Sequence, residues 1–453
     1  MPGDDLRKAV AGLMGRAKND LAELVAFKSV ADAKQYPVEE CQQAAQWVAD
    51  AFAEVGMQNV TMAPTVDGSL AVHGEAPAPD GAPTVLLYSH YDVQPPLGEE
   101  QWESPVFELV EKGGRWYGRG TADCKGNIVM HLTALRALQQ VLGRFPCGVK
   151  VISEGSEEQG TGGLEEFVPE NADVLRADTI LIADTGNFAV GVPTLTSTLR
   201  GMTSVDVTVH ALGSAMHSGM FGGPAPDPVA GLLAMLASMH DEHGNTTIDG
   251  LDNTQIWNGV DYPPEQFRKD ATVLDGVELI GSGSVADMVW ARPAVTVLGI
   301  DVPPVIGSAS AVQASAAARV SLRVPPGVEG RAAQDALVAH LEKRVPWQLR
   351  CEIERVAVGD PFVGSLDGPG FESLKAAMEE AYGRPMTTEG QGGSIPLCNV
   401  LAETYPDAEI FLMGVEEPSC LIHAPNESVD PSEIEHLALA EALFLEKYAQ
   451  TGR

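Results

Sequence analysis

No apolar run in this sequence is long enough to cross a bilayer. A membrane-spanning helix needs about 18 consecutive apolar residues, and the runs found here are much shorter. The stretch MPGDDLRKAVAGLMGRAKNDL at the start also lacks the apolar core of a secretory signal peptide. We therefore expect a cytoplasmic protein that has no membrane partner.

Basic residues are scarce compared with acidic ones. The chain has 29 Lys and Arg against 63 Asp and Glu, which gives a formal net charge of −34 at pH 7. Charge of that sign repels the phosphates of nucleic acids and of anionic lipids. The composition therefore argues against nucleic acid as a partner, whereas it favours the attraction of metal cations.

Cysteines are few and scattered along the chain. They occur at Cys41, Cys124, Cys147, Cys351, Cys398 and Cys420. Their spacing matches neither a disulfide framework nor a thiolate zinc site. Such scattered cysteines are typical of proteins in a reducing compartment.

The length of the chain favours two domains. A chain of 453 residues exceeds the usual size of a single hydrophobic core. Short apolar runs alternate with amphipathic helical patterns up to about residue 198, and a similar order returns after residue 364. We expect one domain from residues 1–198 and 364–453, with a second domain, residues 199–363, inserted into it. The first should be an α/β domain whose mixed, mainly parallel sheet is flanked by helices.

The pattern changes within residues 199–363. Alternating apolar residues predict strands there, and a helical spacing of apolar residues predicts helices. In chain order the expected elements are a strand at 203–210, a helix at 226–240, strands at 294–300 and 316–324, a helix at 331–343 and a strand at 347–356. The order β-α-β-β-α-β is that of a ferredoxin-like α+β domain.

Four apolar runs of the first domain lead into an acidic residue or a histidine. The runs are short and rich in Val, Ile and Leu, as expected for buried parallel strands. They are VLLYSH, which ends at His90, VKVIS, which precedes Glu157 and Glu158, TILIAD, which ends at Asp184, and EIFLMG, which precedes His423. Ligands of such sheets gather beyond the carboxyl ends of the strands. A glycine-rich turn, GRGTADCKG, adds Asp123 to this group.

These side chains predict a site for two metal ions. Two imidazoles and three carboxylates provide nitrogen and oxygen but no thiolate, which suits zinc, manganese or cobalt in a catalytic centre. One such ion usually keeps about three protein ligands, so five donors exceed the need of a single ion. Two ions about 3.5–4 Å apart that share a carboxylate would use all five, and Asp123, in its tight turn, is best placed to be shared. We expect two divalent ions per subunit, with zinc favoured over manganese or cobalt.

Six strings along the chain resemble one known family. They are SHYDVQPP (89–96), GRGTADCKGN (118–127), EGSEEQG (154–160), MHSGMFGG (216–223), GGSIP (392–396) and HAPNE (423–427). Their residues and order are similar to those of the M20 metallopeptidases, and most of all to the carnosinase-like cytosolic nonspecific dipeptidases. The resemblance implies that the first domain is catalytic and that the inserted domain serves as a lid and as a dimerisation domain.

The resemblance also implies a role for each residue of the predicted metal site. One ion would be held by His90, Asp123 and Asp184. The other would be held by Asp123, Glu158 and His423. Glu157 would be the general base, which takes a proton from the attacking water. Asp92 would accept a hydrogen bond from His90 and fix its tautomer without touching metal.

Further site residues are implied in the inserted domain and in the GGSIP string. His217 of MHSGMFGG would reach across a homodimer interface and stabilise the oxyanion that forms at the scissile carbonyl. Arg323, Ser394 and the backbone of Gly393 would bind the carboxylate of the substrate. Arg200 and Arg292 are alternatives to Arg323 for this role.

The activity implied by this set is hydrolysis of small dipeptides that have a free carboxyl terminus. An aminoacylase or another N-acyl amino acid amidohydrolase of the same architecture is an alternative, because the dimetal chemistry does not depend on what flanks the amide. A noncatalytic metal-dependent binding protein is a more distant alternative. The presence of Glu157 as a candidate base argues against it.

Overall fold

The protein is described here from a computed structural model that covers residues 2–79 and 81–451. Its contacts divide it into two compact units. The first unit comprises Met1–Ser197, Gly364–Glu389 and Leu397–Arg453, and the second comprises Thr198–Val363 and Gly390–Pro396. The chain enters the second unit within strand β8 (Thr194–Leu199) and leaves it after β15 (Phe362–Val363).

The first unit contains a large mixed sheet with a parallel centre. The strand order is β1-β2-β6-β3-β7-β17-β8, with β16 also paired to β8. The pairs β6·β3, β3·β7 and β7·β17 are parallel, whereas β1·β2, β2·β6 and β17·β8 are antiparallel. The bounds are β1 Gln58–Pro64, β2 Leu70–Ala76, β3 Thr84–His90, β6 Gly148–Glu154, β7 Thr179–Ala183, β16 Thr387–Gln391 and β17 Glu409–Met413. This arrangement confirms the predicted fold class of the first unit.

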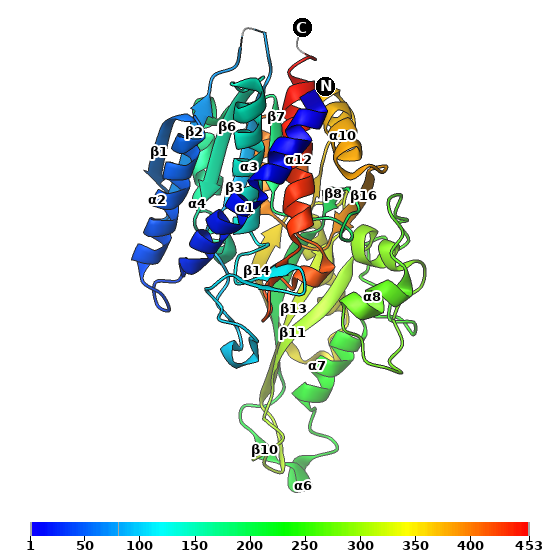
Figure 1. The fold of residues 1–453 in the computed structure, drawn as a ribbon. Helices are drawn as coiled ribbons and strands as arrows, with labels where there is room; N and C mark the ends of the chain where they lie inside the picture. Colours follow the sequence, from blue (N-terminus) through cyan, green and yellow to red (C-terminus); the bar gives the residue numbers. More distant parts are fainter. Residues whose placement is uncertain (1, 80, 452–453) are drawn as a thin grey trace. The chain divides into compact units, whose positions relative to one another are not determined.

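Helices flank this sheet. Helices α1, α3 and α12 lie beside one another, with α10 against α12 and α2 against β1 and β2 (Figure 1). The bounds are α1 Pro2–Ala26, α2 Val38–Glu54, α3 Lys125–Leu142, α4 Gly163–Glu170, α5 Ala172–Leu175, α10 Pro369–Tyr382, α11 Pro396–Thr404 and α12 Pro431–Tyr448. A small separate sheet is formed by β4 Val110–Lys112, β5 Arg115–Tyr117 and β18 Ser428–Val429.

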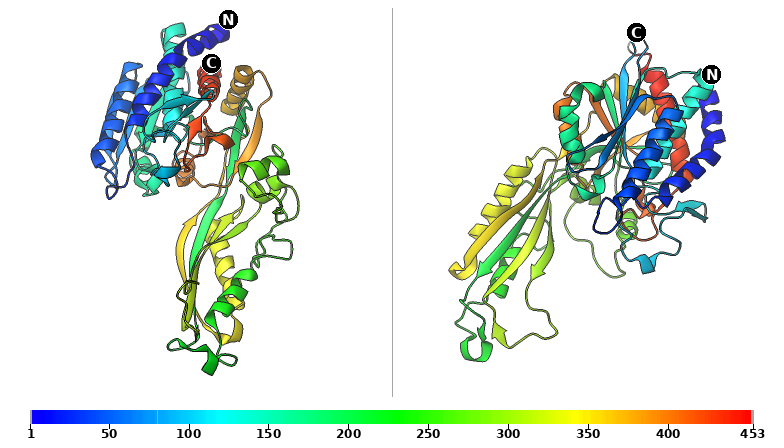
Figure 2. Two further views of the ribbon diagram at one scale, coloured as in Figure 1. Left: turned by 60° about the horizontal axis from the view of Figure 1, so that its bottom comes forward. Right: turned by 90° about the vertical axis from the view of Figure 1, so that its left-hand side faces the viewer.

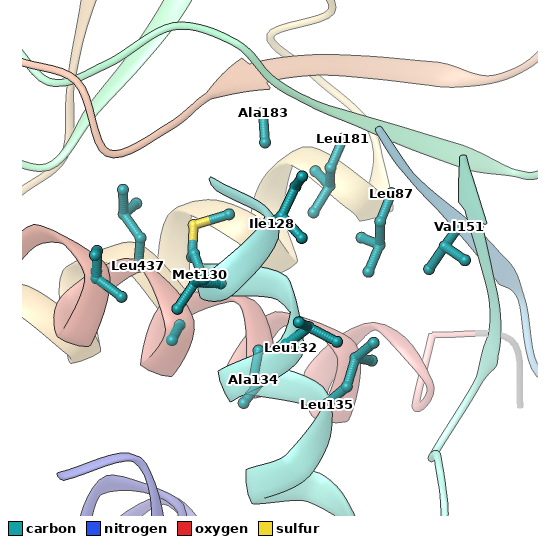
Figure 3. Packing of buried hydrophobic residues seen from close by; sticks show 14 of the residues in the cluster. Leu87, Ile128, Met130, Leu132, Ala134, Leu135, Val151, Leu181, Ala183 and Leu437 are labelled. Carbon is teal, nitrogen blue, oxygen red and sulfur yellow. The ribbon is translucent and has the colours of Figure 1, made fainter. Parts of the chain in front are cut away.

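The hydrophobic core of the first unit surrounds helix α3. Every residue of α3 from Lys125 to Leu138 is buried, because the helix is enclosed by the sheet and by neighbouring helices. Figure 3 shows Leu87, Val151 and Leu181 of the sheet facing the apolar side chains of α3, with Leu437 of α12 nearby. The burial of these side chains fixes the position of the loop that precedes α3.

The second unit is a four-stranded antiparallel sheet with two helices packed on it. Its strand order is β11-β13-β9-β14. Figure 2 shows the helices of this unit lying against the sheet. Val205, Val207 and Val209 alternate along β9 and are buried in one core with residues of α7 and α9. The bounds are β9 Gly201–His210, α7 Pro228–Ala237, β11 Ala294–Asp301, β13 Ser315–Val324, α9 Gly330–Lys343 and β14 Arg350–Gly359. The order β-α-β-β-α-β confirms the predicted ferredoxin-like domain.

Smaller elements of the second unit lie outside this core. They are β10 Met216–His217, α6 Ser218–Phe221, α8 Pro264–Asp270, β12 Ala311–Val312 and the π-helical segment Asp287–Ala291. In the part of the chain that the structure describes, no helix combines the length and the apolar character that a membrane span requires.

A buried ion pair joins α3 to α12. His131 Nδ1 lies 2.6 Å from Glu441 Oε2, and His131 Nε2 lies 3.1 Å from the carbonyl oxygen of Tyr88 in β3. Both side chains are at most 1% exposed. Burial lowers the pKa of His131, but the charge and the hydrogen bond of Glu441 outweigh this, so the pKa is raised above its ordinary value. The imidazolium thus ties a sheet strand and two helices together.

Replacement of His131 by alanine should lower the free energy of unfolding by about 3–5 kcal/mol, because Glu441 is left buried without its partner. The contribution of His131 should be complete below its unfolded pKa of about 6.5 and be lost as the pH rises through the raised folded value. Urea unfolding of the wild type and of His131→Ala, from below about pH 6.5 upward, measures the difference in their free energies of unfolding. His243→Ala, on an exposed side chain, is the control. A difference that stays constant with pH would contradict an ionised pair.

Candidate metal centre

The predicted metal-binding residues meet at one edge of the first unit's sheet. Strands β6, β3, β7 and β17 are adjacent and parallel, so their carboxyl ends lie along the same edge. The residues at or beyond these ends are His90 after β3, Glu157 and Glu158 after β6, Asp184 after β7 and His423 after β17. The turn before α3 brings Asp123 to the same place.

A first group of donor atoms surrounds His90. Its Nε2 lies 3.0 Å from Asp123 Oδ1 and 3.0 Å from Asp184 Oδ1. All three side chains are less than a tenth exposed. Cys124 is also close to His90 and Asp184, but its Sγ donates to the carbonyl oxygen of Ala183 at 3.0 Å, and burial raises the pKa of this thiol to about 12.

A second group surrounds His423. Its Nε2 lies 3.0 Å from Asp123 Oδ2 and 3.1 Å from Glu158 Oε2. Asp123 therefore turns one carboxylate oxygen to each histidine. His423 has a positive φ of 60°, a left-handed backbone conformation that is uncommon for residues other than glycine. The carboxylate of Asp123 occupies the shared position between the two groups.

The donor set fits a pair of divalent cations. Bonds from zinc to nitrogen or oxygen are about 2.0–2.2 Å long, so donors on one tetrahedral ion lie about 3.3 Å apart, close to the distances found within each group. Without a bound cation, the carboxylates of this site repel one another. Burial raises the pKa of Asp184 and Glu158, and the charge of Asp123 adds to the effect at both. Bound cations would offset this repulsion.

Asp92 holds the loop that carries the two adjacent glutamates. Its carboxylate accepts hydrogen bonds from the backbone N–H of Glu157 at 3.2 Å and of Glu158 at 3.1 Å. The same carboxylate lies 3.3 Å from His90 Nδ1. Gln94 Nε2 donates to Glu158 Oε2 at 2.7 Å. Asp92 is fully buried. It thus orients His90 of the first group and Glu158 of the second group.

Glu157 differs from its neighbour Glu158. Within residues 2–79 and 81–451, no donor is within hydrogen-bond distance of the Glu157 carboxylate. Burial and then the charge of Asp184 raise the pKa of Glu157. A carboxylate that is close to the metal groups, unbonded and of raised proton affinity is suited to accept a proton.

Glu427 is a residue of this site that was not recognised from the sequence. Its carboxylate is fully buried and accepts four hydrogen bonds from the loop that leads to Asp123. The donors are Arg119 Nη1 at 2.8 Å and the backbone N–H groups of Gly120 at 3.0 Å, Ala122 at 3.0 Å and Asp123 at 3.2 Å. Glu427 belongs to the string HAPNE, whose other end is His423, and this proximity was the available signal.

Glu416 is a second residue that the sequence analysis missed. One of its carboxylate oxygens lies within 4.8 Å of ligand atoms of Asp123 and Asp184. The residue is buried, and burial raises its pKa well above the ordinary value, with the charges of Asp123 and Asp184 adding to the shift. The pair Glu416-Glu417 follows β17 as Glu157-Glu158 follows β6. A second acidic pair after a parallel strand was therefore a usable signal.

The other predicted site residues belong to the second unit. His217 is exposed at the end of β10, where its Nδ1 accepts a hydrogen bond from Gly219 N–H at 3.1 Å. Arg323 is half-buried on β13, and burial lowers its pKa. Gly393 is exposed and Ser394 is half-buried in the stretch Gly390–Pro396. The structure groups these residues in the second unit, whereas all the metal donors belong to the first.

Known proteins resemble this chain along nearly its whole length. Residues 86–447 match the sequence profile of peptidase family M20/M25/M40. A cysteinylglycine-S-conjugate dipeptidase of Corynebacterium striatum is 43% identical over 439 residues, which cover 96% of each chain. The Cys-Gly metallodipeptidase dug1 of Schizosaccharomyces pombe is 28% identical over 82% of this chain and 80% of that one. Human carnosine dipeptidase 1 has the same fold, with a TM-score of 0.82 over 99% of both chains at 22% identity.

Replacement of Glu427 by glutamine should weaken metal binding about 10–100-fold, because the neutral amide no longer holds the N–H groups that position Asp123. Calorimetric titration with Zn²⁺ of protein from which a chelator has removed the metal measures the affinity for zinc. Glu403→Gln, on an exposed side chain, should bind like the wild type. Unchanged zinc affinity in a folded Glu427→Gln protein would show that the loop keeps its shape without this carboxylate.

Proposed function

The chain belongs to peptidase family M20/M25/M40, and from this membership we propose that it is a dinuclear metallopeptidase that hydrolyses dipeptides with a free carboxyl terminus. Substrates of the Cys-Gly type are favoured, because the relative from Corynebacterium striatum is named for cysteinylglycine S-conjugates. The observation that carries the proposal is the position of Asp123, which offers one oxygen to each of two histidine–carboxylate groups.

The two groups of donors are assigned to two ions. His90, Asp123 and Asp184 hold one, and Asp123, Glu158 and His423 hold the other. When bound, the ions supply Lewis acidity at the scissile amide and at the attacking water. The ligand types suit zinc, with manganese and cobalt as alternatives.

Glu157 moves the proton. Its carboxylate takes a proton from the attacking water and passes it to the leaving amine, so one group serves as base and then as acid. Asp92 supports this step, because it fixes the backbone of Glu157 and the ring of His90 together. The proton acceptor is thereby held at a constant distance from the reacting atoms.

Residues of the second unit bind the substrate's carboxylate. Among the described residues no acid pairs with Arg323, whose guanidinium is thus free to take a carboxylate. Gly393 and Ser394 offer a backbone N–H and a hydroxyl group. His217 is proposed to act in a second subunit's site, where it stabilises the oxyanion, and its exposure suits that role.

The proposal includes the division of labour between domains and the setting of the enzyme. Residues 1–198 and 364–453 form the catalytic domain, apart from the segment Gly390–Pro396, whose contacts group it with the second unit. Residues 199–363 form a lid and dimerisation domain. The enzyme is a homodimer in the cytoplasm. Its six unpaired cysteines support a reducing compartment.

The direct test is a hydrolysis screen on chelated protein that is reloaded with Zn²⁺, Mn²⁺ or Co²⁺ separately. Cys-Gly and Ala-Ala should be cleaved, whereas N-acetyl amino acids should be cleaved slowly or not at all. Glu157→Gln should keep its metal and lose about 10²–10⁴-fold in kcat. Asp123→Ala should lose the metal as well. Glu166→Gln, on an exposed side chain, is the matched control.

Three outcomes would contradict the proposal. Preference for N-acetyl amino acids would make the enzyme an amidohydrolase of the aminoacylase type. No turnover of any amide by metal-loaded protein would favour a noncatalytic binding protein. Equal loss of metal in Glu157→Gln and Asp123→Ala would reverse the roles given to Glu157 and Glu158.

Mixing two inactive variants tests the role of His217. In a heterodimer of Glu157→Gln and His217→Ala subunits, the site with an intact Glu157 receives its histidine from the other subunit. Random exchange of subunits should therefore restore about a quarter of the wild-type activity. If His217 acted within its own subunit, each site would lack one of the two groups, and mixing would restore nothing.

A further inference from the structure

The second unit contains a cavity that is separate from the metal-binding residues. Its volume is about 430 Å³, within the usual range for sites that bind small molecules. It lies between the segment after α7, the loop 273–281, the π-helical segment Asp287–Ala291 and the start of β11. Apolar side chains form a large part of its wall, among them Val277, Ile280, Val285, Met288, Val289 and Val295.

One buried cation lines this cavity, and no acid among the described residues forms an ion pair with it. Arg200 is 8% exposed, and its Nε has no hydrogen-bond partner among the described residues. Its Nη1 reaches only the carbonyl oxygens of Met288 and Arg292, each at 3.4 Å. Burial and the positive charge of Arg323 lower the pKa of Arg200 to about 10. A buried guanidinium without an acid is costly, and a bound anion would offset that cost.

The second arginine of the wall, Arg292, has hydrogen-bond partners and a nearby acid. Arg292 Nε donates to the carbonyl oxygen of Gln255 at 2.8 Å, and its Nη1 donates to that of Ser282. Its Nη2 also lies 3.7 Å from Asp287. Arg200 is thus the group of this wall that needs an anion. Glu278 also lines the cavity, but this residue is exposed, and among the described residues no ion pair joins it to Arg200. The buried positive charge of Arg200 therefore matches a ligand with a single negative charge.

We propose that this cavity binds a small aliphatic carboxylic acid, whose carboxylate pairs with the guanidinium of Arg200 while its hydrocarbon part lies against the aliphatic wall. The planar guanidinium matches the geometry of a carboxylate. Val277 and Ile280, which are 52% and 66% exposed, continue the apolar surface to the mouth of the cavity. The lining includes neither Arg323 nor Ser394, the two side chains to which the peptide's carboxylate is assigned.

The cavity is tested by calorimetric titration of zinc-loaded protein with octanoate, 1-octanol and acetate. Octanoate should bind, and the other two should bind at least about tenfold more weakly, because each lacks one of the two recognised parts. Arg200→Gln should weaken octanoate binding by a similar factor. Val277→Trp should do the same by filling the mouth, and this exposed position makes the test independent of how Arg200→Gln folds.

Two controls separate this cavity from other carboxylate sites. Arg319→Gln removes an exposed arginine that is already paired with Asp206 and should leave octanoate binding unchanged. Asp123→Ala disables the candidate metal centre and should also leave it unchanged. Binding that is lost in Asp123→Ala but kept in both cavity variants would place octanoate at the metal centre and overturn the proposal. Equal affinity of the wild type and both cavity variants would overturn it as well.

Discussion

The shared carboxylate of Asp123 is the constraint on which the rest of the candidate site depends. Each of its oxygens faces a different histidine at 3.0 Å, so a small shift of this one side chain would break both groups. Its surroundings are built to prevent such a shift. Glu427 holds the backbone on the amino-terminal side of Asp123, and the buried helix α3 (Lys125–Leu142) fixes the chain on the other side. The metal donors are thus positioned by residues that would not themselves contact the metal ions.

The residues assigned to metal binding and those proposed to recognise the substrate belong to different units of the molecule. The candidate metal donors all belong to the unit with the parallel sheet, where strand ends and a buried helix fix their positions. The groups proposed to bind the substrate's carboxylate belong to the other unit, which has an antiparallel sheet and a core of its own. Such a division allows the recognition of a substrate to change while the chemistry is kept.

The main features of the fold could be predicted from the sequence because they depend on local patterns. The apolar runs before His90 and Asp184 form adjacent parallel strands, and that adjacency alone brings their ends together. The contributions of Glu427 and Glu416 could not be predicted in the same way. Glu427 acts on amides about 300 residues earlier in the chain, and no local pattern encodes such a contact. The cavity beside Arg200 is equally hidden, because irregular segments form much of its wall.

The order of the donors along the chain has a consequence for biosynthesis. His423 and Glu427 follow His90 and Asp123 by about 300 or more residues. Until residues 423–427 have been synthesised and have left the ribosome, the nascent polypeptide carries only part of the donor set, and the loop before Asp123 lacks the carboxylate of Glu427. Metal uptake into the complete centre therefore cannot begin before this segment has emerged, and a ribosome that stalls before codon 423 yields a product with neither His423 nor Glu427.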